Sequence, residues 1–415
     1  MTNLRQLTFG LGAALAASSG WYGAALAAGD DTIVLGAAVS ITGKYSTNGQ
    51  NTKDGYDLAV QVVNDKGGVK VGDKAYQLEI IYYDDESTPA RSAQLTERLI
   101  KQDGVQFMLG PYGSGLTKAV APVTEKFKVP MVEANGAARE LFTEGYKYLF
   151  AVLSTSDYYL RDAVKLAAEQ AQAAGKDPSE VTVAIAVEND PFSLDVRDGL
   201  IEDAEKYGMQ VVIDDKLPPE LNDMSATLTK VKALQPDLLA VSAHAKGPTL
   251  AVGQMKDMQV YVPMLALTHC DSAQVAEKMG AAAEYALCAS QWDASLAYED
   301  EYFGSAADYA KLFEQTFDYA APYQAAESTA GVLVFVDALE RAGSLDPEAV
   351  RDALAETDLM TFYGPVKFDE TGKNTAKPMV LYQIQDGQYK VVAPTEWAAA
   401  ELIHPMPTWD ERDGT

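Results

Sequence analysis

Cysteine and histidine are scarce in this sequence. Its 415 residues include only two cysteines, Cys270 and Cys288, and three histidines. Structural zinc centres take their four ligands mainly from these two residue types, usually as closely spaced pairs. The sequence therefore excludes a cysteine-rich zinc site, and we expect neither a bound metal nor a cofactor.

Positive charge is also in short supply. Lysine and arginine together number 33 against 60 aspartates and glutamates, which gives a formal net charge of -27 at pH 7. Nucleic acids and anionic membranes are held by clustered basic side chains, so both are excluded as partners. The acidity favours a soluble chain, and we expect a monomer.

Long hydrophobic runs are missing as well. The apolar run at residues 7–17 is well short of the roughly 18 to 20 residues that a spanning helix needs, and residues 18–20 interrupt it. Arg5 before the run and the small-x-small pattern Ala25-Leu26-Ala27 after it are typical of an export signal. We expect residues 1–27 to be removed near Ala27 and the mature protein to be periplasmic. Because no cysteine lies near that site, we expect neither a lipid anchor nor membrane insertion.

The usual catalytic motifs are absent too. Gly110, Gly113 and Gly115 lack both the Lys-Ser/Thr pair of a phosphate loop and the glycine spacing of a dinucleotide site. No Gly-x-Ser-x-Gly elbow and no His-Glu-x-x-His helix occurs in the sequence. The carboxylates of residues 84–86 favour a turn at a strand end over a divalent-metal site. We expect no catalytic residues, and a secreted α/β enzyme is kept as an alternative.

What the sequence does contain is a regular alternation of strand-like and helix-like segments. Residues 32–38 are apolar like a strand, and Tyr56, Ala59, Val60 and Val63 then follow at the spacing of one buried helix face. The alternation continues to about residue 132 and restarts at residue 181. It predicts two parallel sheets, each covered by helices on both faces. Ligands of such sheets bind where the strands end.

The end of the chain and the two cysteines allow alternatives. A hairpin is expected to join residues 379–385 and 389–392 through an Asp386-Gly387 turn, and for the Pro-containing tail an extended wrap and a disordered end both stay open. An oxidising compartment permits a disulfide between Cys270 and Cys288. Because each cysteine borders an apolar, strand-like run, a pair of buried free thiols stays open too.

A succession of short motifs follows the predicted strands and helices in a fixed order. They are Ser40-Ile41-Thr42-Gly43, Gly49, Asn64-Asp65-Lys66-Gly67-Gly68-Val69, Tyr83-Asp84-Asp85, Pro89, residues 110–114, Val129-Pro130, and Phe362-Tyr363-Gly364-Pro365-Val366-Lys367-Phe368-Asp369 with Gly372. Each motif alone is weak, but their order covers nearly all of the chain after the signal. In this the sequence resembles the leucine/isoleucine/valine-binding branch of the type I periplasmic binding proteins.

The resemblance implies two doubly wound parallel-sheet lobes joined by a hinge of three crossings, an arrangement known as a Venus flytrap. We expect the crossings near Leu153, Ala289 and Phe368. The first lobe would then hold residues 28–153 and 289–367, the second lobe residues 154–288 and 368–397, and residues 398–415 would form the tail. Closure of the lobes would bury a small solute, and the membrane permease of an ABC importer would recognise the closed shape. A sensor that presents its solute to a signalling receptor uses the same fold and stays open.

The resemblance also places a carboxylate-binding site on the first lobe. In this family a serine after the third strand and backbone N–H groups after the fourth hold the ligand's carboxylate. Ser114 matches the serine, and Asn135, Gly136 and Ala137 match the backbone segment, although Ala137 stands where threonine is common. Ser114 also suits the N-cap of the following helix, whose N-terminus favours an anion.

The second lobe departs from the family pattern. Phe192 and His244 stand where the family has tyrosines, and neither Leu267 nor Thr268 supplies the acidic partner of an amino acid's ammonium group. An ammonium buried without a carboxylate is costly, so a carboxylic acid without an amine fits better than an amino acid. The candidates to replace the missing acid are Glu188, Asp190 and Asp271.

Other residues at loop positions complete the predicted ligand site. The aromatic rings of its tyrosines and tryptophan, like that of Phe192, suit stacking on a ring or an aliphatic chain, and ordinary packing between the lobes is the alternative for each. His269, like His244, suits a hydrogen bond to the ligand, and a purely structural role is the alternative. These residues are Tyr45, Asn48, Tyr112, Tyr158, Thr268, His269, Trp292 and Tyr323.

Overall fold

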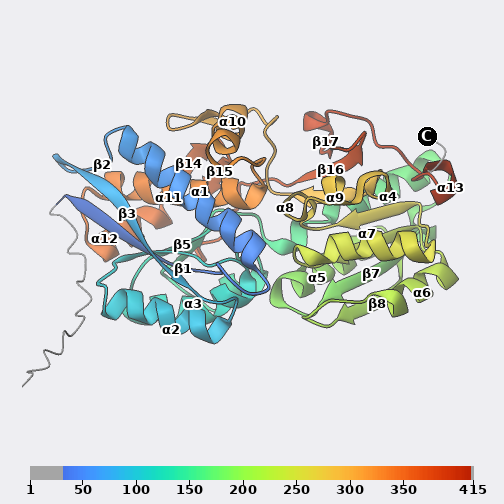
Figure 1. Cartoon of the computed structure of the whole chain (residues 1–415), viewed down its shortest axis with the longest axis horizontal. Coiled ribbons are helices and arrows are strands. Elements are labelled where there is room, and N and C mark those ends of the chain that lie inside the picture. The colour runs from blue at the N-terminus through green and yellow to red at the C-terminus, as the bar shows by residue number, and fades with distance from the viewer. Residues whose placement is uncertain (1–30, 413–415) are drawn as a thin grey trace, which may run out of the picture.

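A computed structural model of the chain describes residues 31–412. Figure 1 shows two lobes side by side, each with a sheet between layers of helices. The predicted class, α/β with two parallel-sheet lobes, is confirmed. The expected export signal, residues 1–27, lies outside the described residues. Within residues 31–412, no helix is both long and apolar enough to cross a bilayer.

The first sheet is parallel except for one edge hairpin. Its spatial order is β2 (Val69–Val71), β3 (Lys74–Asp84), β1 (Thr32–Val39), β4 (Phe107–Leu109), β5 (Met131–Glu133) and β6 (Leu149–Ala151). Only β2 and β3 run antiparallel. β1 is continuously apolar because helices cover both faces of the sheet, and six of its eight residues are buried.

Helices from distant parts of the chain cover the first sheet. They are α1 (Ser46–Asp65), α2 (Pro89–Lys101), α3 (Ser114–Phe127), α10 (Ala306–Phe317), α11 (Tyr323–Ala342) and α12 (Pro347–Ala355). α1 packs against α11, and the predicted inner face of α1 buries Tyr56, Ala59 and Val63. A side chain at Gly55 would come within 2.2 Å of the Ala325 carbonyl oxygen, so glycine permits this close approach.

The second sheet has seven strands. Its spatial order is β17 (Gln388–Ala393), β16 (Val380–Gln385), β11 (Leu287–Ser290), β10 (Met264–Leu267), β9 (Leu238–Ser242), β7 (Thr182–Glu188) and β8 (Gln210–Leu217). The antiparallel pair β16 and β17 is the expected hairpin, and Asp386 and Gly387 both have positive φ, as its tight turn requires. The helices of this lobe are α4 (Arg161–Ala173), α5 (Pro191–Lys206), α6 (Ser225–Leu234), α7 (Lys246–Met258), α8 (Cys270–Ala273) and α9 (Val275–Met279).

Small elements complete the two lobes. Two hairpins, β12 (Glu299–Asp300) with β13 (Gly304–Ser305) and β14 (Asp358–Thr361) with β15 (Gly364–Lys367), lie near the first lobe. The tail ends in α13 (Trp409–Arg412) and wraps over the second lobe. The Met406 N–H donates to the Pro263 carbonyl at 2.8 Å, and the Trp409 indole donates to the Val260 carbonyl at 2.9 Å. Of the two forms left open for the tail, the extended wrap is the one found up to residue 412.

Three segments that cross between the lobes are hydrogen-bonded to one another. Ser154 and Gln291 exchange two bonds of 3.1 and 2.9 Å, and the Ser154 hydroxyl donates to the Lys377 carbonyl. The third crossing was expected near Phe368. The Phe368 ring packs on Phe150 of the first sheet, with ring centres 5.4 Å apart, and the second sheet resumes only at β16. We therefore propose that the chain crosses for the third time near Lys377 and not at Phe368.

The structure joins Cys270 and Cys288 in a disulfide, with the two Cα atoms 5.8 Å apart. The bridge ties the start of α8 to β11 and closes a loop over a sequence separation of 18 residues. A cross-link of this kind restricts the unfolded chain more than the folded one.

Removing the bridge is expected to destabilise the protein. The double variant Cys270→Ala/Cys288→Ala should lose roughly 3 kcal/mol of unfolding free energy, as loop-closure entropy predicts for a loop of about this length. Urea denaturation with and without a reducing agent measures the loss. The reductant should lower the midpoint of the wild type and leave that of the double variant unchanged. A wild-type midpoint that does not respond to reduction would contradict the bridge.

Candidate ligand-binding site

The carboxyl ends of the two sheets meet between the lobes, where the N-termini of α3 and α5 lie close together. A Cβ atom at Gly113, just before α3, would lie 3.9 Å from Cε1 of His244 on the second lobe. A Cβ atom at Gly115 would lie 3.8 Å from Cδ of Pro191, the first residue of α5. Because helix N-termini carry partial positive charge, two of them at one crevice favour an anion.

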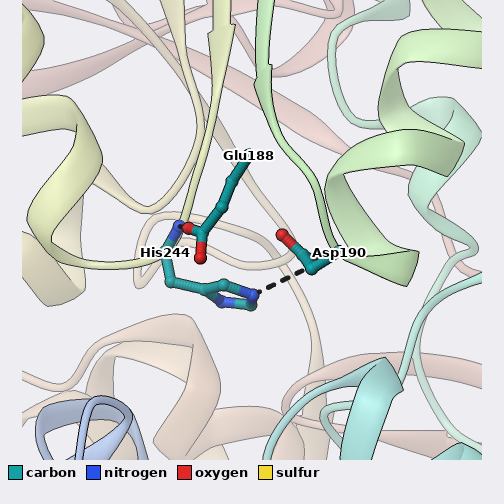
Figure 2. A group of neighbouring side chains, drawn as sticks. All are labelled: Glu188, Asp190 and His244. Carbon is teal, nitrogen blue, oxygen red and sulfur yellow. Dashed lines mark hydrogen bonds and ion pairs between the residues drawn. The ribbon is translucent and has the colours of Figure 1, made fainter. Parts of the chain in front are cut away.

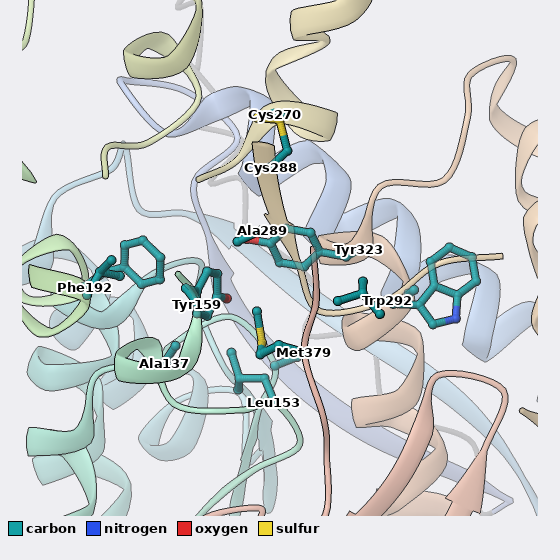
Figure 3. Close-up of a cluster of buried hydrophobic side chains, with 14 of the residues drawn as sticks. Ala137, Leu153, Tyr159, Phe192, Cys270, Cys288, Ala289, Trp292, Tyr323 and Met379 are labelled. Atoms are coloured by element: carbon teal, nitrogen blue, oxygen red, sulfur yellow. A yellow bond between two sulfur atoms is a disulfide. The ribbon is translucent and has the colours of Figure 1, made fainter. Parts of the chain in front are cut away.

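Seven aromatic rings form what we call the interlobe ring cluster. Each is at most 8% exposed. The cluster is held mainly by edge-on and tilted contacts, such as Tyr159 against Phe192 with centres 4.9 Å apart, a geometry that rings prefer. Figure 3 shows Phe192, Tyr159 and Tyr323 in this region. The members are Tyr45, Tyr112, Tyr159, Phe192, His244, His269 and Tyr323.

The Tyr112 hydroxyl of the first lobe contacts both histidines of the second. His269 Nδ1 lies 3.0 Å from the Ala243 carbonyl oxygen, which can only accept, so Nδ1 carries the proton and Nε2 accepts. Tyr112 donates its one proton to Nε2 of His269 at 3.1 Å. The hydroxyl oxygen therefore accepts from Nδ1 of His244 at 2.9 Å.

The other nitrogen of His244 faces a buried carboxylate. Its Nε2 lies 3.4 Å from Oδ1 of Asp190 (Figure 2). Burial alone would raise the pKa of Asp190, but His244 and the N–H groups at the start of α5 outweigh it and hold this pKa below its ordinary value. With Nδ1 donating to Tyr112, the Nε2 side of the His244 ring is left facing the carboxylate.

His269, by contrast, is held neutral. Burial, and next the positive charge of His244, lower the pKa of His269 to about 3. A neutral ring agrees with the hydrogen bonds, in which Nδ1 donates and Nε2 accepts. The site thus holds His269 as an uncharged ring beside the Tyr112 hydroxyl.

The predicted carboxylate-binding residues of the first lobe lie together but already bond one another. The Ser114 hydroxyl oxygen accepts from the N–H groups of Ala137 and Ala138 at 3.1 and 3.0 Å. The N–H groups of Asn135 and Gly136 donate to Glu133. Burial raises the pKa of this glutamate to about 7. These donors are thus occupied in the closed form described, and their contact with a ligand stays a prediction. Asn135 keeps its buried Oδ1 without a hydrogen-bond partner within the described chain.

Four other predicted site residues lie outside the ring cluster: Asn48, Thr268, Tyr158 and Trp292. Asn48 donates to the Ser272 hydroxyl across the lobes at 3.2 Å. Thr268 is buried within the second lobe, where its hydroxyl bonds the backbone of Ala243.

Two predicted aromatic residues point elsewhere. Tyr158 is 40% exposed, and the Arg161 guanidinium covers its ring at 3.8 Å. The Trp292 indole donates to the Phe362 carbonyl at 3.1 Å and packs edge-on against Tyr309, so it belongs to a separate aromatic group.

Sequence reasoning missed several residues that join the lobes. Tyr159 enters the ring cluster, although only its neighbour Tyr158 was predicted to; two adjacent tyrosines give no signal of which one turns inward. Arg139 reaches from the first lobe to Asp195 of α5 at 2.6 Å, and Lys44 lies 3.5 Å from Glu188. Their acidic partners lie on α5 and at the end of β7, and no periodicity in the sequence marks a pair of residues so far apart along the chain.

The acidic residues after β3 order the loop that carries Tyr45. Asp84 accepts from the N–H groups of Ile41 and Thr42, both at 3.1 Å. Asp85 accepts from the Ser40 hydroxyl at 2.7 Å. The carboxylates thus serve the turn that was expected at this strand end.

Comparison with known proteins gives one consistent result. A family model described as "Periplasmic binding protein" matches residues 32–388. Leu/Ile/Val-binding protein homolog 8 of Brucella abortus (strain 2308) is 25% identical over 96% of this chain and 98% of its own length.

Solved structures share the fold. The branched-chain amino acid transporter substrate binding protein LivJ of Streptococcus pneumoniae, in complex with isoleucine, has a TM-score of 0.75 at 21% identity and covers 90% of this chain and 100% of its own. A solute binding protein of an ABC transporter from Rhodopseudomonas palustris BisB5, in complex with 3,4-dihydroxybenzoic acid, has a TM-score of 0.76 at 18% identity. It covers 92% of this chain and 100% of its own.

The neutral state of His269 predicts a pH dependence of stability. Its folded pKa of about 3 lies below the ordinary value of 6.5, so the unfolded chain takes up the proton first as the pH falls. The stability that neutral His269 contributes is therefore complete above about pH 6.5 and is lost as the pH falls toward about 3.

The substitution His269→Asn removes this titration. Asparagine also tolerates the left-handed backbone found at position 269, where φ is 60°. Between about pH 6.5 and 5 the wild type should lose roughly 1.5 kcal/mol more unfolding free energy than His269→Asn. Urea denaturation of both proteins at the two pH values measures this difference. Equal losses in the two proteins would show that His269 is not held neutral.

Proposed function

Because the chain belongs to the periplasmic binding protein family, we propose that it is the solute-binding component of an ABC importer of the branched-chain amino acid type. The family consists of solute-binding proteins and not of enzymes. The protein captures a small, carboxylate-bearing solute between its lobes, and a membrane permease recognises the closed form. It acts in the periplasm as a monomer, after removal of the signal near Ala27.

One observation carries the choice of an anionic solute: the N-termini of two helices, one from each lobe, converge on one buried crevice. The N-termini of α3 and α5 lie against each other there, and His244 follows at the end of β9. In the form described, the Tyr112 hydroxyl satisfies both histidines. A carboxylate or phenol oxygen of the solute offers the same kind of partner, so the solute displaces the Tyr112 hydroxyl and binds beside Ser114.

The carboxylates named as partners for an ammonium group are already engaged. Asp271 accepts from the N–H groups of Ser272 and Tyr323, Asp190 faces His244, and Glu188 faces Lys44. An added ammonium would compete with these partners. The interlobe ring cluster instead surrounds the crevice with aromatic faces and edges, which suit a ring. An aromatic carboxylic acid therefore fits the site better than an aliphatic acid or an amino acid.

A thermal-shift panel tests the solute class. Benzoate and its hydroxylated forms should raise the melting temperature more than leucine, isoleucine or valine, because only a solute that binds the native state stabilises it. The same compounds are then titrated by calorimetry. A panel in which only the amino acids bind would contradict the aromatic acid and leave the binding-protein role intact.

Two substitutions test the site. Ser114→Ala and His244→Ala should each lower the affinity for the most tightly bound acid by about 10- to 100-fold. This is the usual cost of losing a hydrogen bond to a charged group. Ser179→Ala and His404→Ala, on the far surface of the second lobe and in the tail, are matched controls and should leave the affinity unchanged. Unchanged affinity in both site variants would show that the solute binds elsewhere.

Deletion of the gene separates transport from sensing. Uptake of the bound acid should be lost in the deletion strain. Uptake that persists while the cell's response to the acid disappears would instead identify a sensor.

A further inference from the structure

Three ionisable side chains of the second lobe surround one small space at the crevice (Figure 2). Glu188 ends β7, Asp190 caps α5, and His244 follows β9. One oxygen or nitrogen atom of each lies within 4.8 Å of the other two. The three residues are 5%, 8% and 8% exposed, respectively. They form the one such group of potential metal ligands within residues 31–412.

Asp190 brings an unused ligand atom to this space. Its Oδ1 accepts from the N–H groups of Phe192 and Ser193 at 2.9 and 3.2 Å. Its Oδ2 is buried and has no hydrogen-bond partner among the described residues. Buried carboxylate oxygens are nearly always paired with protein, water or an ion, so this atom points to a missing partner.

The spacing of the group fits a coordinated ion better than a direct contact. Nε2 of His244 and Oδ1 of Asp190 are 3.4 Å apart, whereas a charge-assisted hydrogen bond is about 2.7 to 2.9 Å long. Two ligands of a tetrahedral zinc ion, with bonds of about 2.0 to 2.2 Å, stand about 3.4 Å apart.

A small cavity beside the group offers space for an ion, and its lining carries two glutamates and two lysines. A cavity of about 30 Å³ adjoins Glu188 and His244, which is enough for one ion or water. Glu220 lines the same cavity and adds negative charge. Lys44 and Lys246 also line it. Lys44 lies 3.5 Å from Glu188, and its side chain is 26% exposed, so it can turn toward solvent when an ion binds.

We propose that Glu188, Asp190 and His244 form a binding site for a divalent transition-metal ion of the Zn²⁺ class. One imidazole and two carboxylates are a ligand set that such ions accept. Their charge of −2 with a neutral imidazole matches a divalent cation. Three protein ligands leave a position for water or for an anionic group of a solute. The proposal does not depend on the importer role or on the identity of that solute.

Zinc titration of the purified protein after EDTA treatment and dialysis tests the site. One equivalent of Zn²⁺ should bind per chain, as measured by calorimetry. Asp190→Asn, His244→Ala and Glu188→Gln should each weaken binding at least about tenfold, since even outer partners of a metal site contribute that much. Asparagine is a good N-cap, so Asp190→Asn keeps the start of α5. The matched controls Asp73→Asn, at an exposed turn, and His404→Ala should bind zinc like the wild type.

Cobalt substitution gives an independent readout of geometry. Co²⁺ in the wild type should show the intense visible absorption of a tetrahedral site, and His244→Ala should lose it while its circular dichroism shows a folded chain. Absence of a stoichiometric Zn²⁺ site, or controls that weaken binding as much as the site variants, would overturn the proposal. Solute titration in the presence of EDTA separates the two proposals. Solute binding without a zinc site overturns only the metal site, and zinc binding without any solute overturns only the proposed function.

Discussion

At the centre of the contact between the two lobes, one phenol hydroxyl is held between two histidines. Closing the crevice buries His244, His269 and Asp190, and buried polar groups are costly unless each finds a partner. Tyr112 provides that partner from the opposite lobe by donating to one ring and accepting from the other. The neutral state of His269 agrees with this arrangement. A solute that enters the site must supply equivalent partners, and this requirement favours oxygen-bearing, anionic molecules.

A second constraint lies at the hinge, where the three crossing segments are tied together. Ser154, Gln291 and Lys377 share hydrogen bonds, and the Lys377 ammonium donates to the carbonyls of Gln291 and Pro378. Burial lowers the pKa of this lysine to about 7, although the nearby Glu327 opposes the shift. These hydrogen bonds tie the three segments into one connection between the lobes.

Much of the fold could be predicted from the sequence, but only part of the site. The alternating apolar segments predicted both sheets because buried parallel strands and amphipathic helices leave periodic signals. Ser114 and His244 were predicted as site residues because they follow strands at motif positions. Tyr159 was not predicted to belong to the site. Nor was it predicted that Glu188, Asp190 and His244 form one group. Residues 188 and 244 are 56 positions apart, and only the pairing of β7 with β9 brings them together. The scarcity of cysteine and histidine excludes a cysteine-rich centre, but it says nothing about one histidine beside two carboxylates.

The central claim is that an anionic solute binds between the lobes by replacing the Tyr112 hydroxyl at the two histidines. The most direct test is a crystal structure of the protein with the acid that raises its melting temperature most. The account predicts that the solute lies in the crevice, with an oxygen within hydrogen-bond distance of His244 and with Ser114 beside its carboxylate. A solute bound on one lobe alone, or Tyr112 still bonded to both histidines in the complex, would contradict it.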